Sequence, residues 1–191
     1  MYSYLIEQTS CHNTGILICL LTGLRIGEVC ALRWEDISFA DHTIYVHQTA
    51  QRIQNEDGEE RKTRVVVTSP KSVSGKRLIP MPQNLETALW NLDSARTGFV
   101  LSRDGMHLME PCVLQYHFKK ILKKLDIEEA NFHILRHTFA TSCIELGFDV
   151  KSLSEILGHS SVSITMNKYV HPSMALKQEN MQRLSSLFAV K

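Results

Sequence analysis

The spacing of apolar residues changes twice along this chain, and that change limits the folds open to it. Residues 16–24 and 28–33 carry apolar side chains at helical intervals, and Gly23 is placed to end the first of these helices. In residues 43–49, by contrast, Ile44, Val46 and Gln48 alternate with Tyr45, His47 and Thr49, as in a β-strand. Residues 65–68 are rich in the β-branched residues that strands favour. Helical spacing returns in the second half of the chain. The sequence therefore predicts a mostly α-helical domain with a small antiparallel β-sheet near its front, an α+β fold.

Turn residues mark where the strands of this sheet are joined. The polar segment 55–60 contains an Asp-Gly pair, which is a strong hairpin signal between β-prone stretches. Residues 77–80 are expected to form a short third strand, which a turn at residues 72–75 precedes. The sheet is therefore expected at about residues 37–80 of a single domain that spans residues 1–191.

Further helix signals follow the sheet. Amphipathic helices are expected over residues 82–93, 110–125, 134–146 and 149–158, and over a C-terminal tail at about 173–188. Asp149 is a residue type that caps helix starts, and Gly158 is placed to end the same helix. Ser160 or Ser161 caps one more helix, which carries Tyr169.

The composition is typical of a protein from an aqueous, reducing compartment. No apolar run approaches the roughly 18–20 residues that a membrane span needs, and the N-terminus lacks the basic start of a secretory signal. The five cysteines are scattered and lack a Cys-x-x-Cys pair, which favours reduced thiols over a disulfide framework or a zinc site. We therefore expect a cytoplasmic protein with no membrane partner.

Charge is distributed unevenly, although the net charge is only +1. Residues 1–60 hold three Lys/Arg against nine Asp/Glu, whereas residues 61–124 hold twelve Lys/Arg against four Asp/Glu. Positive charge that is concentrated in one region can attract phosphate even when the whole protein is nearly neutral. The four lysines between residues 119 and 124 are better interpreted as a solvated helix face.

Two guanidiniums, two imidazoles, an ammonium and a phenol form a set suited to an anionic phosphoryl centre. These groups belong to Arg25, Lys71, His133, Arg136, His159 and Tyr169. His133 and Arg136 are three residues apart at a helix start, so both project from one helix face. Taken singly, each motif has a simpler interpretation: His-x-x-Arg as a surface pair, His159 as a capping residue and Tyr169 as core packing. The case for a site therefore depends on all six meeting in one place.

The segments that hold these residues resemble the catalytic domain of the tyrosine recombinase (phage integrase) family. The similar segments, in the family's order, are residues 22–28 (TGLRIGE), 69–72 (SPKS), 77–80 (RLIP), 133–141 (HILRHTFAT), 157–160 (LGHS) and 169–171 (YVH). The resemblance spans nearly all of the chain and implies the tyrosine recombinase catalytic-domain fold. It also implies that Tyr169 is the nucleophile and that the other five residues activate the reaction.

The implied reaction is cleavage and rejoining of a DNA strand through a 3′-phosphotyrosine bond. A phenol with an ordinary pKa of about 10 is mostly protonated at neutral pH and attacks an anionic phosphodiester poorly. Arg25 and Arg136 can each give two parallel hydrogen bonds to the phosphate, and His159 can donate a third. Lys71 is expected to protonate the leaving 5′ oxygen, and His133 to help remove the phenol proton. No metal or other cofactor is expected.

Double-stranded DNA is the partner that this reaction implies. Lys76 and Arg77 are candidate contacts to backbone phosphates, or else a turn that aids solubility. The tail at about residues 173–188 is expected to dock on a neighbouring protomer, which would give a tetramer on DNA, unless it folds back on its own domain. Family members normally carry an N-terminal core-binding domain as well. The chain is therefore expected to be a C-terminal fragment of an integrase that a prokaryotic cell, phage or other mobile element encodes.

Two other functions remain open at this point. A type IB topoisomerase would use the same chemistry to rejoin the original strand, so that DNA is relaxed without strand exchange. A non-catalytic DNA-binding accessory protein would retain the fold alone. Because all six candidate positions are occupied by suitable residues, the sequence favours a site-specific recombinase or integrase of a mobile element.

Overall fold

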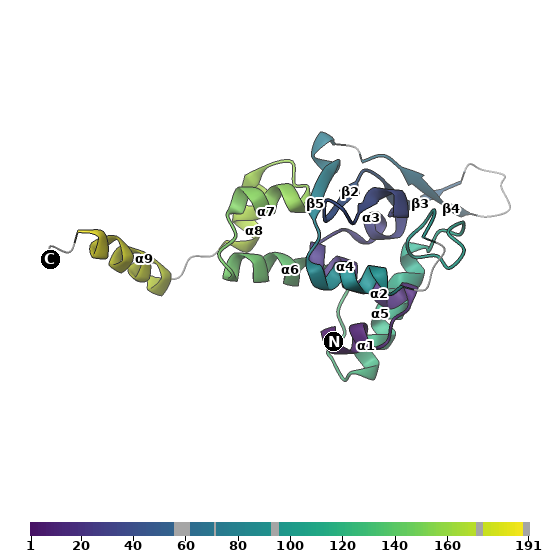
Figure 1. Ribbon diagram of the computed structural model, residues 1–191, viewed down its shortest axis with the longest axis horizontal. Coiled ribbons are helices and arrows are strands. Elements are labelled where there is room, and N and C mark those ends of the chain that lie inside the picture. The colour runs from purple at the N-terminus through teal and green to yellow at the C-terminus, as the bar shows by residue number, and fades with distance from the viewer. Residues whose placement is uncertain (56–61, 71, 93–95, 171–173, 189–191) are drawn as a thin grey trace.

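The computed structural model describes every residue except 56–61, 71, 93–95, 171–173 and 189–191. Its α-helices are α1 (Tyr2–Glu7), α2 (Cys11–Thr22), α3 (Ile26–Ala31), α4 (Gln83–Trp90), α5 (Pro111–Lys124), α6 (His133–Glu145), α7 (Val150–Leu157), α8 (Val162–Tyr169) and α9 (Met174–Leu187). Its strands are β1 (Ile37–Ser38), β2 (Thr43–Val46), β3 (Thr49–Gln54), β4 (Thr63–Thr68) and β5 (Arg77–Pro80). The predicted fold class is confirmed, because the chain is mostly helical with small antiparallel sheets between α3 and α4 (Figure 1).

The N-terminal helices begin earlier than the apolar spacing predicts. The helix expected at residues 16–24 is α2, which starts directly after Ser10 because that side chain accepts a hydrogen bond from the backbone N–H of Asn13. Asn13 and Thr14 are polar but buried in the first turn of α2, so this turn shows no apolar stripe. Helix α1 has no counterpart in the prediction. Gly23 ends α2 in the left-handed conformation (φ 67°), as predicted.

The residues between α3 and α4 form two sheets rather than the single sheet predicted. Strand β2 pairs antiparallel with β1 and with β5, whereas β3 and β4 form a separate antiparallel hairpin. The alternating residues 43–49 therefore belong to two strands, because β2 ends at Val46 and β3, in the other sheet, begins at Thr49. Alternation of side chains continues through this crossover, so the sequence pattern cannot show it. The predicted turn residues 56–60 lie outside the described part of the chain.

Polar caps define the helices of the C-terminal half. Asp149 caps α7 by accepting hydrogen bonds from the backbone N–H groups of Lys151 and Ser152, as predicted. Ser161 is the cap of α8, because its hydroxyl accepts a hydrogen bond from the N–H of Ser163. Gly158 ends α7 with a positive φ of 65°. The connection between α7 and α8 is therefore a short turn fixed at both ends.

Buried apolar residues gather in two clusters. The larger one joins α2, α3, α4 and α5 to β2 and β5, and includes Ile18, Val29, Ile44, Leu85 and Phe118. The smaller one lies among α6, α7 and α8, and consists of Ala140, Cys143, Leu153, Leu157 and Tyr169. Helix α6 also packs on α2, so it connects the α7–α8 unit to the main body. In the described part of the chain, no helix has both the length and the apolar character needed to cross a membrane.

Candidate active site

Arg136 lies at the centre of the candidate site. Its side chain comes from the first turn of α6, and the residue is only 2% exposed. Nη1 donates to the carbonyl oxygen of Gly23 and Nη2 to that of Leu157, each at 2.7 Å. These carbonyls lie at the C-terminal ends of α2 and α7, where helices present unsatisfied acceptors and a partial negative charge. The guanidinium therefore joins two helix ends and is held in a defined orientation.

His159 follows this helix end and contacts Arg136 directly. Its Nε2 lies 3.0 Å from Nη2 of Arg136, and its Nδ1 lies 2.8 Å from Oγ1 of Thr165. Burial, followed by the positive charges of Arg136 and Arg25, lowers the pKa of His159 to about 4. The imidazole is therefore neutral at pH 7.

Glycine is required where the chain turns into His159. Gly158 has a positive φ of 65°, and a Cβ there would lie 2.8 Å from Nη1 of Arg77 and 2.9 Å from the carbonyl oxygen of Ser74. A larger residue would displace either the ion-paired guanidinium or the turn before β5. Gly158 thus allows the end of α7 to lie close against the residues that surround the site.

Arg25 reaches the same turn from the start of α3. Its Nη2 lies 3.5 Å from the carbonyl oxygen of Gly158, and its Nη1 donates to Oε1 of Glu28 at 2.9 Å. The backbone N–H of Arg25 also donates to Glu28, so the carboxylate fixes both the backbone and the side chain. The Arg25 side chain remains 44% exposed. It can therefore meet a ligand from solvent, whereas Arg136 is buried.

The expectation that Arg77 contacts DNA is corrected by its position. Its side chain is 7% exposed and forms a two-point ion pair with Glu28, with Nη2–Oε2 at 2.9 Å and Nη1–Oε1 at 3.2 Å. Its Nε also donates to the carbonyl oxygen of Ile156 in α7. Arg77 therefore ties β5 to α3 and α7 inside the protein. Lys76 is exposed and stays a candidate for contact with DNA.

Glu28 is a buried acid whose ionisation depends on these two arginines. Burial raises its pKa, but hydrogen bonds and charge from Arg77, and then from Arg25, hold the pKa of Glu28 below its ordinary value. The carboxylate is thus ionised at neutral pH. Sequence reasoning missed Glu28, although its position three residues after Arg25 has the spacing of a helix-capping interaction.

Tyr169 is the last residue of α8 and lies within the smaller apolar cluster. Its ring is stacked on that of His159, with centroids 6.4 Å apart and planes 4° apart, and the His137 ring lies 5.3 Å away. The residue is 6% exposed, and its phenol oxygen is buried without a hydrogen-bond partner among the described residues. The phenol is thus beside the imidazole of His159 but is not engaged by a base.

His133 lies on the exposed side of the same region. Its Nε2 lies 3.3 Å from Nζ of Lys168, the residue that precedes Tyr169. Burial, followed by the charge of Lys168, lowers the pKa of His133. The lone pair of Nε2 therefore faces an ammonium group in this structure, and contact with the phenol is not part of it.

The structure thus brings together five of the six residues predicted from the sequence, at the junction of α2, α3, α6, α7 and α8. They are Arg25, His133, Arg136, His159 and Tyr169. Lys71 lies outside the described residues. Thr165 and Lys168 belong to the same region and were not predicted; Thr165 is four residues before Tyr169, and that spacing is a signal for a shared helix face.

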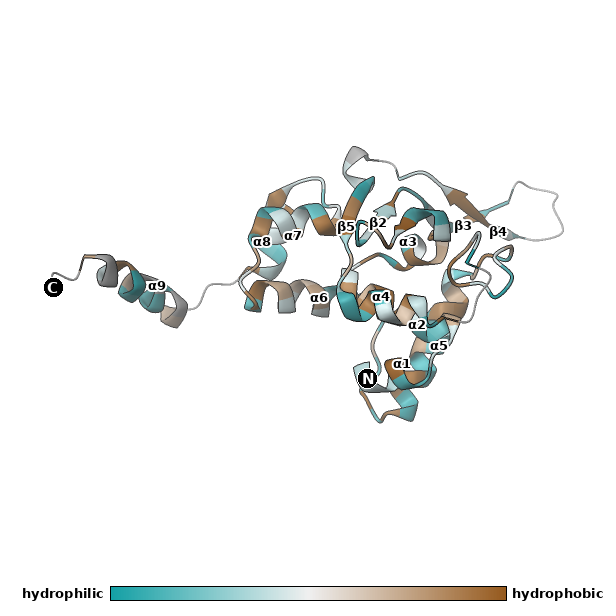
Figure 2. Ribbon diagram, in the orientation of Figure 1, coloured by the Kyte–Doolittle hydropathy of each residue, from teal (hydrophilic) through white to brown (hydrophobic). Residues whose placement is uncertain are grey.

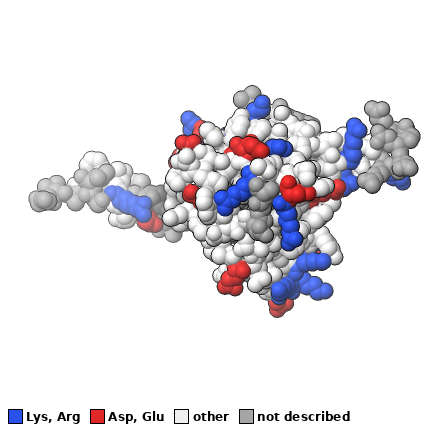
Figure 3. Space-filling view, turned by 45° about the vertical axis from the view of Figure 1, so that its right-hand side comes forward, with Lys and Arg blue, Asp and Glu red and all other residues white. Residues whose placement is uncertain are grey.

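The electrostatic character of this region favours an anion. The pKa of Arg136 is lowered to about 10, first by burial and then by the charge of Arg25. This mutual repulsion is relieved when an anion binds between the cations. On the face shown in Figure 3, by contrast, Lys and Arg of the described residues are interspersed with Asp and Glu. Among the described residues, no three His, Cys, Asp or Glu side chains are grouped as metal ligands would be.

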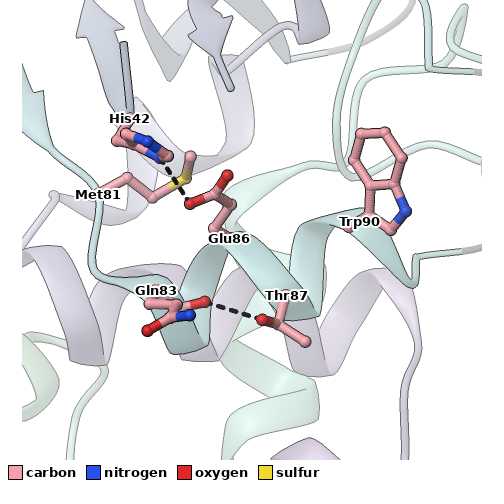
Figure 4. A pocket seen from close by; sticks show the side chains of 6 residues that line it. All are labelled: His42, Met81, Gln83, Glu86, Thr87 and Trp90. Carbon is pink, nitrogen blue, oxygen red and sulfur yellow. Dashed lines mark hydrogen bonds and ion pairs between the residues drawn. The ribbon is translucent and has the colours of Figure 1, made fainter. Parts of the chain in front are cut away.

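A surface pocket of about 550 Å³ lies elsewhere on the molecule, between β2, β5 and α4 (Figure 4). Its lining residues are His42, Met81, Gln83, Glu86, Thr87 and Trp90. Nδ1 of His42 lies 2.8 Å from Oε2 of Glu86 in this pocket. It contains none of the six predicted residues, and its two titratable side chains contact each other.

Comparison with known proteins shows the family to which the chain belongs. Residues 6–175 match the model of the phage integrase family. The chain is 30% identical over 190 residues to a "Tyrosine recombinase XerC-like" protein of Caldanaerobacter subterraneus, with 90% of this chain and 48% of that protein covered. It is 32% identical over 171 residues to transposase A from transposon Tn554 of Staphylococcus aureus, with 86% of this chain and 45% of that protein covered. The chain thus spans about half the length of these curated relatives.

A solved structure shares the fold as well. The Tn1549 transposon integrase, in complex with a circular intermediate DNA, superposes with a TM-score of 0.76 at 26% sequence identity. The match covers 96% of this chain and 63% of that one. Because the family model covers most of the residues and includes every segment of the candidate site, this chain belongs to the phage integrase (tyrosine recombinase) family.

Proposed function

We propose that this chain is the catalytic domain of a site-specific DNA recombinase that cuts and rejoins strands through a 3′-phosphotyrosine intermediate. The observation that carries the proposal is the convergence of Arg25, Arg136 and His159 on the end of α7, with the Tyr169 ring stacked on His159. The Tn1549 integrase, which has the same fold, is known in complex with DNA. Double-stranded DNA is therefore the proposed substrate.

The two arginines and His159 are proposed to hold the scissile phosphate. Arg136 is oriented by two helix ends and Arg25 by Glu28, so their remaining N–H donors are preorganised before the substrate arrives. A phosphodiester that binds beside Arg25 would lie near these donors, and attack would require the buried phenol of Tyr169 to turn toward it. Preorganised donors of this kind each contribute a few kcal/mol of transition-state stabilisation.

Tyr169 is proposed to attack the phosphorus, so that the new Tyr–O–P bond forms as the bond to the 5′ oxygen breaks. His133 accepts the phenol proton, which requires its Nε2 to exchange Lys168 for the phenol when DNA binds. Lys71 gives a proton to the leaving 5′ oxygen. A 5′-hydroxyl from another strand then attacks the phosphotyrosine, and the energy of the cut bond is retained.

Helix α9 is proposed to join protomers into a tetramer on DNA. It lies apart from the other helices in Figure 1, and it carries both apolar and polar residues in Figure 2. Met174, Met181 and Leu184 of α9 are exposed, as is Phe188 directly after it. Apolar side chains so displayed are suited to burial against a second copy of the chain. We place the reaction in the cytoplasm of a prokaryotic cell, where a mobile element's DNA is found.

A plasmid assay separates this function from its alternatives. Duplexes that bind the protein are selected from a random-sequence library, and two copies of the selected site are placed in one supercoiled plasmid. A recombinase deletes or inverts the DNA between the two sites. Relaxation of plasmids irrespective of the site would indicate a topoisomerase instead, and tight binding with neither product would indicate an accessory protein.

A further inference from the structure

His159 is held on both sides of its ring, and only one of the two partners belongs to the predicted site. Nε2 contacts Arg136, whereas Nδ1 lies 2.8 Å from the hydroxyl of Thr165, which is 0% exposed. We propose that Thr165 is a positioning residue that selects the tautomer of His159 together with Arg136 and lets the ring change tautomer when a phosphate binds. This inference rests on the proposed function.

The contacts define which nitrogen carries the proton in the absence of DNA. A guanidinium has only donors, so Nε2 of His159 must accept from Arg136. The imidazole is neutral at pH 7, because burial and the neighbouring arginines lower the pKa of His159 to about 4. A neutral ring that accepts at Nε2 carries its proton on Nδ1. That N–H then donates to Oγ1 of Thr165.

Phosphate binding requires the other tautomer. The non-bridging oxygens of a phosphodiester are acceptors, so His159 can bind them through Nε2 only when Nε2 carries a hydrogen. In a neutral ring the proton leaves Nδ1 and another arrives at Nε2 by exchange with water, and the ring charge does not change. Nδ1 then becomes an acceptor and needs a donor. The hydroxyl of Thr165 can accept a hydrogen bond from Nδ1–H without DNA. By rotating its hydrogen, it can donate to the unprotonated Nδ1 when phosphate is bound.

The same contact fixes the nucleophile relative to the phosphate site. Thr165 and Tyr169 are four residues apart on α8 and therefore lie on one face of that helix. The imidazole of His159 is thus hydrogen-bonded to one residue of this face and stacked on the other, with ring planes 4° apart. Loss of the Thr165 hydroxyl should disturb both the tautomer and the alignment of the phenol.

Three variants test the proposal: Thr165→Val, Thr165→Ser, and Thr14→Val as the control. Thr14 is 3% exposed in α2 and lies outside the site, so it reports the cost of burying valine in place of threonine. The tautomer is measured from the ¹⁵N chemical shifts of the His159 ring at pH 7, first without DNA. Wild type, Thr165→Ser and Thr14→Val should show the Nδ1–H form. In Thr165→Val only Arg136 still favours this form and the Nδ1–H group is left without its acceptor, so the fraction of the Nδ1–H form should be measurably smaller.

The second measurement is the single-turnover rate of cleavage of a selected, nicked duplex. Thr165→Val should cleave roughly tenfold or more slowly, since a buried ring nitrogen loses its partner. Thr165→Ser and Thr14→Val should stay within about threefold of wild type. An unchanged tautomer, or an unchanged cleavage rate, in Thr165→Val overturns the proposal. If Thr165→Val does not fold, Thr165→Ala is measured in its place with the same expected results.

These two measurements can fail independently of each other. If wild type itself does not cleave any selected duplex, the proposed function fails, but the NMR comparison without DNA still decides whether Thr165 selects the tautomer. If wild type cleaves while the tautomer is the same in all variants, the proposed function stands and the role of Thr165 is refuted.

Discussion

Nη2 of Arg136 lies 3.0 Å from Nε2 of His159, and the same nitrogen donates to the carbonyl oxygen of Leu157 at 2.7 Å. One guanidinium group therefore holds the end of α7 and the imidazole that follows it. Because Nη1 is bound to Gly23 at the end of α2, the relative position of three helices depends on this side chain. Arg136 therefore fixes the positions of His159 and of the helix ends around the proposed phosphate site.

Replacing Arg136 with lysine should show that its fork shape, and not only its charge, is required. An ammonium group is a single point charge and cannot bridge Gly23, Leu157 and His159 in their present positions. We expect the rate of single-turnover cleavage in Arg136→Lys to fall roughly 100-fold or more, as for the loss of a preorganised donor. Arg103→Lys, at an exposed residue away from the site, is the control and should cleave at the wild-type rate. Equal rates in both variants would refute the geometric role of Arg136.

Glu28 should be a large contributor to stability, because its carboxylate accepts from Arg25 and Arg77 in a buried setting. Glu28→Gln leaves the guanidinium of Arg77 buried without its counter-charge. The free energy of unfolding, measured with urea, should fall by about 3 kcal/mol or more. Glu35→Gln is the control, since Glu35 pairs with Arg33 at a side-chain exposure of 58% and should change stability by less than about 1 kcal/mol. Similar losses in the two variants would contradict this account.

Much of the fold could be predicted because its signals are local. Asp149, Gly158 and a serine before α8 mark helix ends through their own side chains or backbone conformation. The crossover at His47 could not be predicted, since strand pairing with β5 or β4 depends on residues far along the chain. For the same reason a β-strand arginine such as Arg77 resembles a surface cation until its buried partner is known.

In the candidate site, too, residues with a recognisable sequence motif could be predicted, and residues whose role depends on a contact could not. Residue types and order indicated Arg25, Arg136, His159 and Tyr169, and the structure places these side chains together. The sequence did not indicate Thr165, because a threonine carries chemical information only when the atom it contacts is known. The catalytic roles themselves stay predictions, which depend on the experiments described for each residue.

The free energy of unfolding should fall as the pH is lowered, because His159 has a lower pKa in the folded protein than in the unfolded chain. The folded-state pKa of about 4 lies below the ordinary value of 6.5, so between these values the unfolded chain binds a proton that the folded chain does not. The free energy of unfolding should therefore decrease from pH 6.5 to pH 4. His133 contributes with the same sign, because its pKa is also lowered.

Urea titrations at several pH values between 7.5 and 4.5 measure this dependence. In His159→Asn the decrease should be smaller, because one of the groups responsible has been removed. Carboxylates titrate in both proteins and cancel in the comparison. A pH dependence that is equally steep in wild type and in His159→Asn would contradict the low pKa of His159.

Lys71, which lies outside the described residues, is predicted to be the general acid. Lys71→Ala should slow cleavage of ordinary DNA, since the leaving 5′ oxygen needs a proton. The rate should be largely restored when that oxygen is replaced by sulfur, because a thiolate leaves without one. Rates are compared on matched oxygen and sulfur duplexes. Lys76→Ala is the control: because Lys76 is a candidate contact to DNA and not a proton donor, any slowing should be the same on both duplexes. Equal slowing on both substrates would remove Lys71 from this role.

The central claim is that the phenol of Tyr169 becomes bonded to DNA. The most direct measurement uses a selected duplex nicked next to the cleavage site, which traps the cut strand on the protein. Protein–DNA adducts that survive denaturation are digested with trypsin, and the peptide that carries the nucleotide is sequenced by mass spectrometry. The account predicts that the adduct maps to Tyr169 and is missing in Tyr169→Phe. An adduct on another residue, or one that persists in Tyr169→Phe, would contradict it.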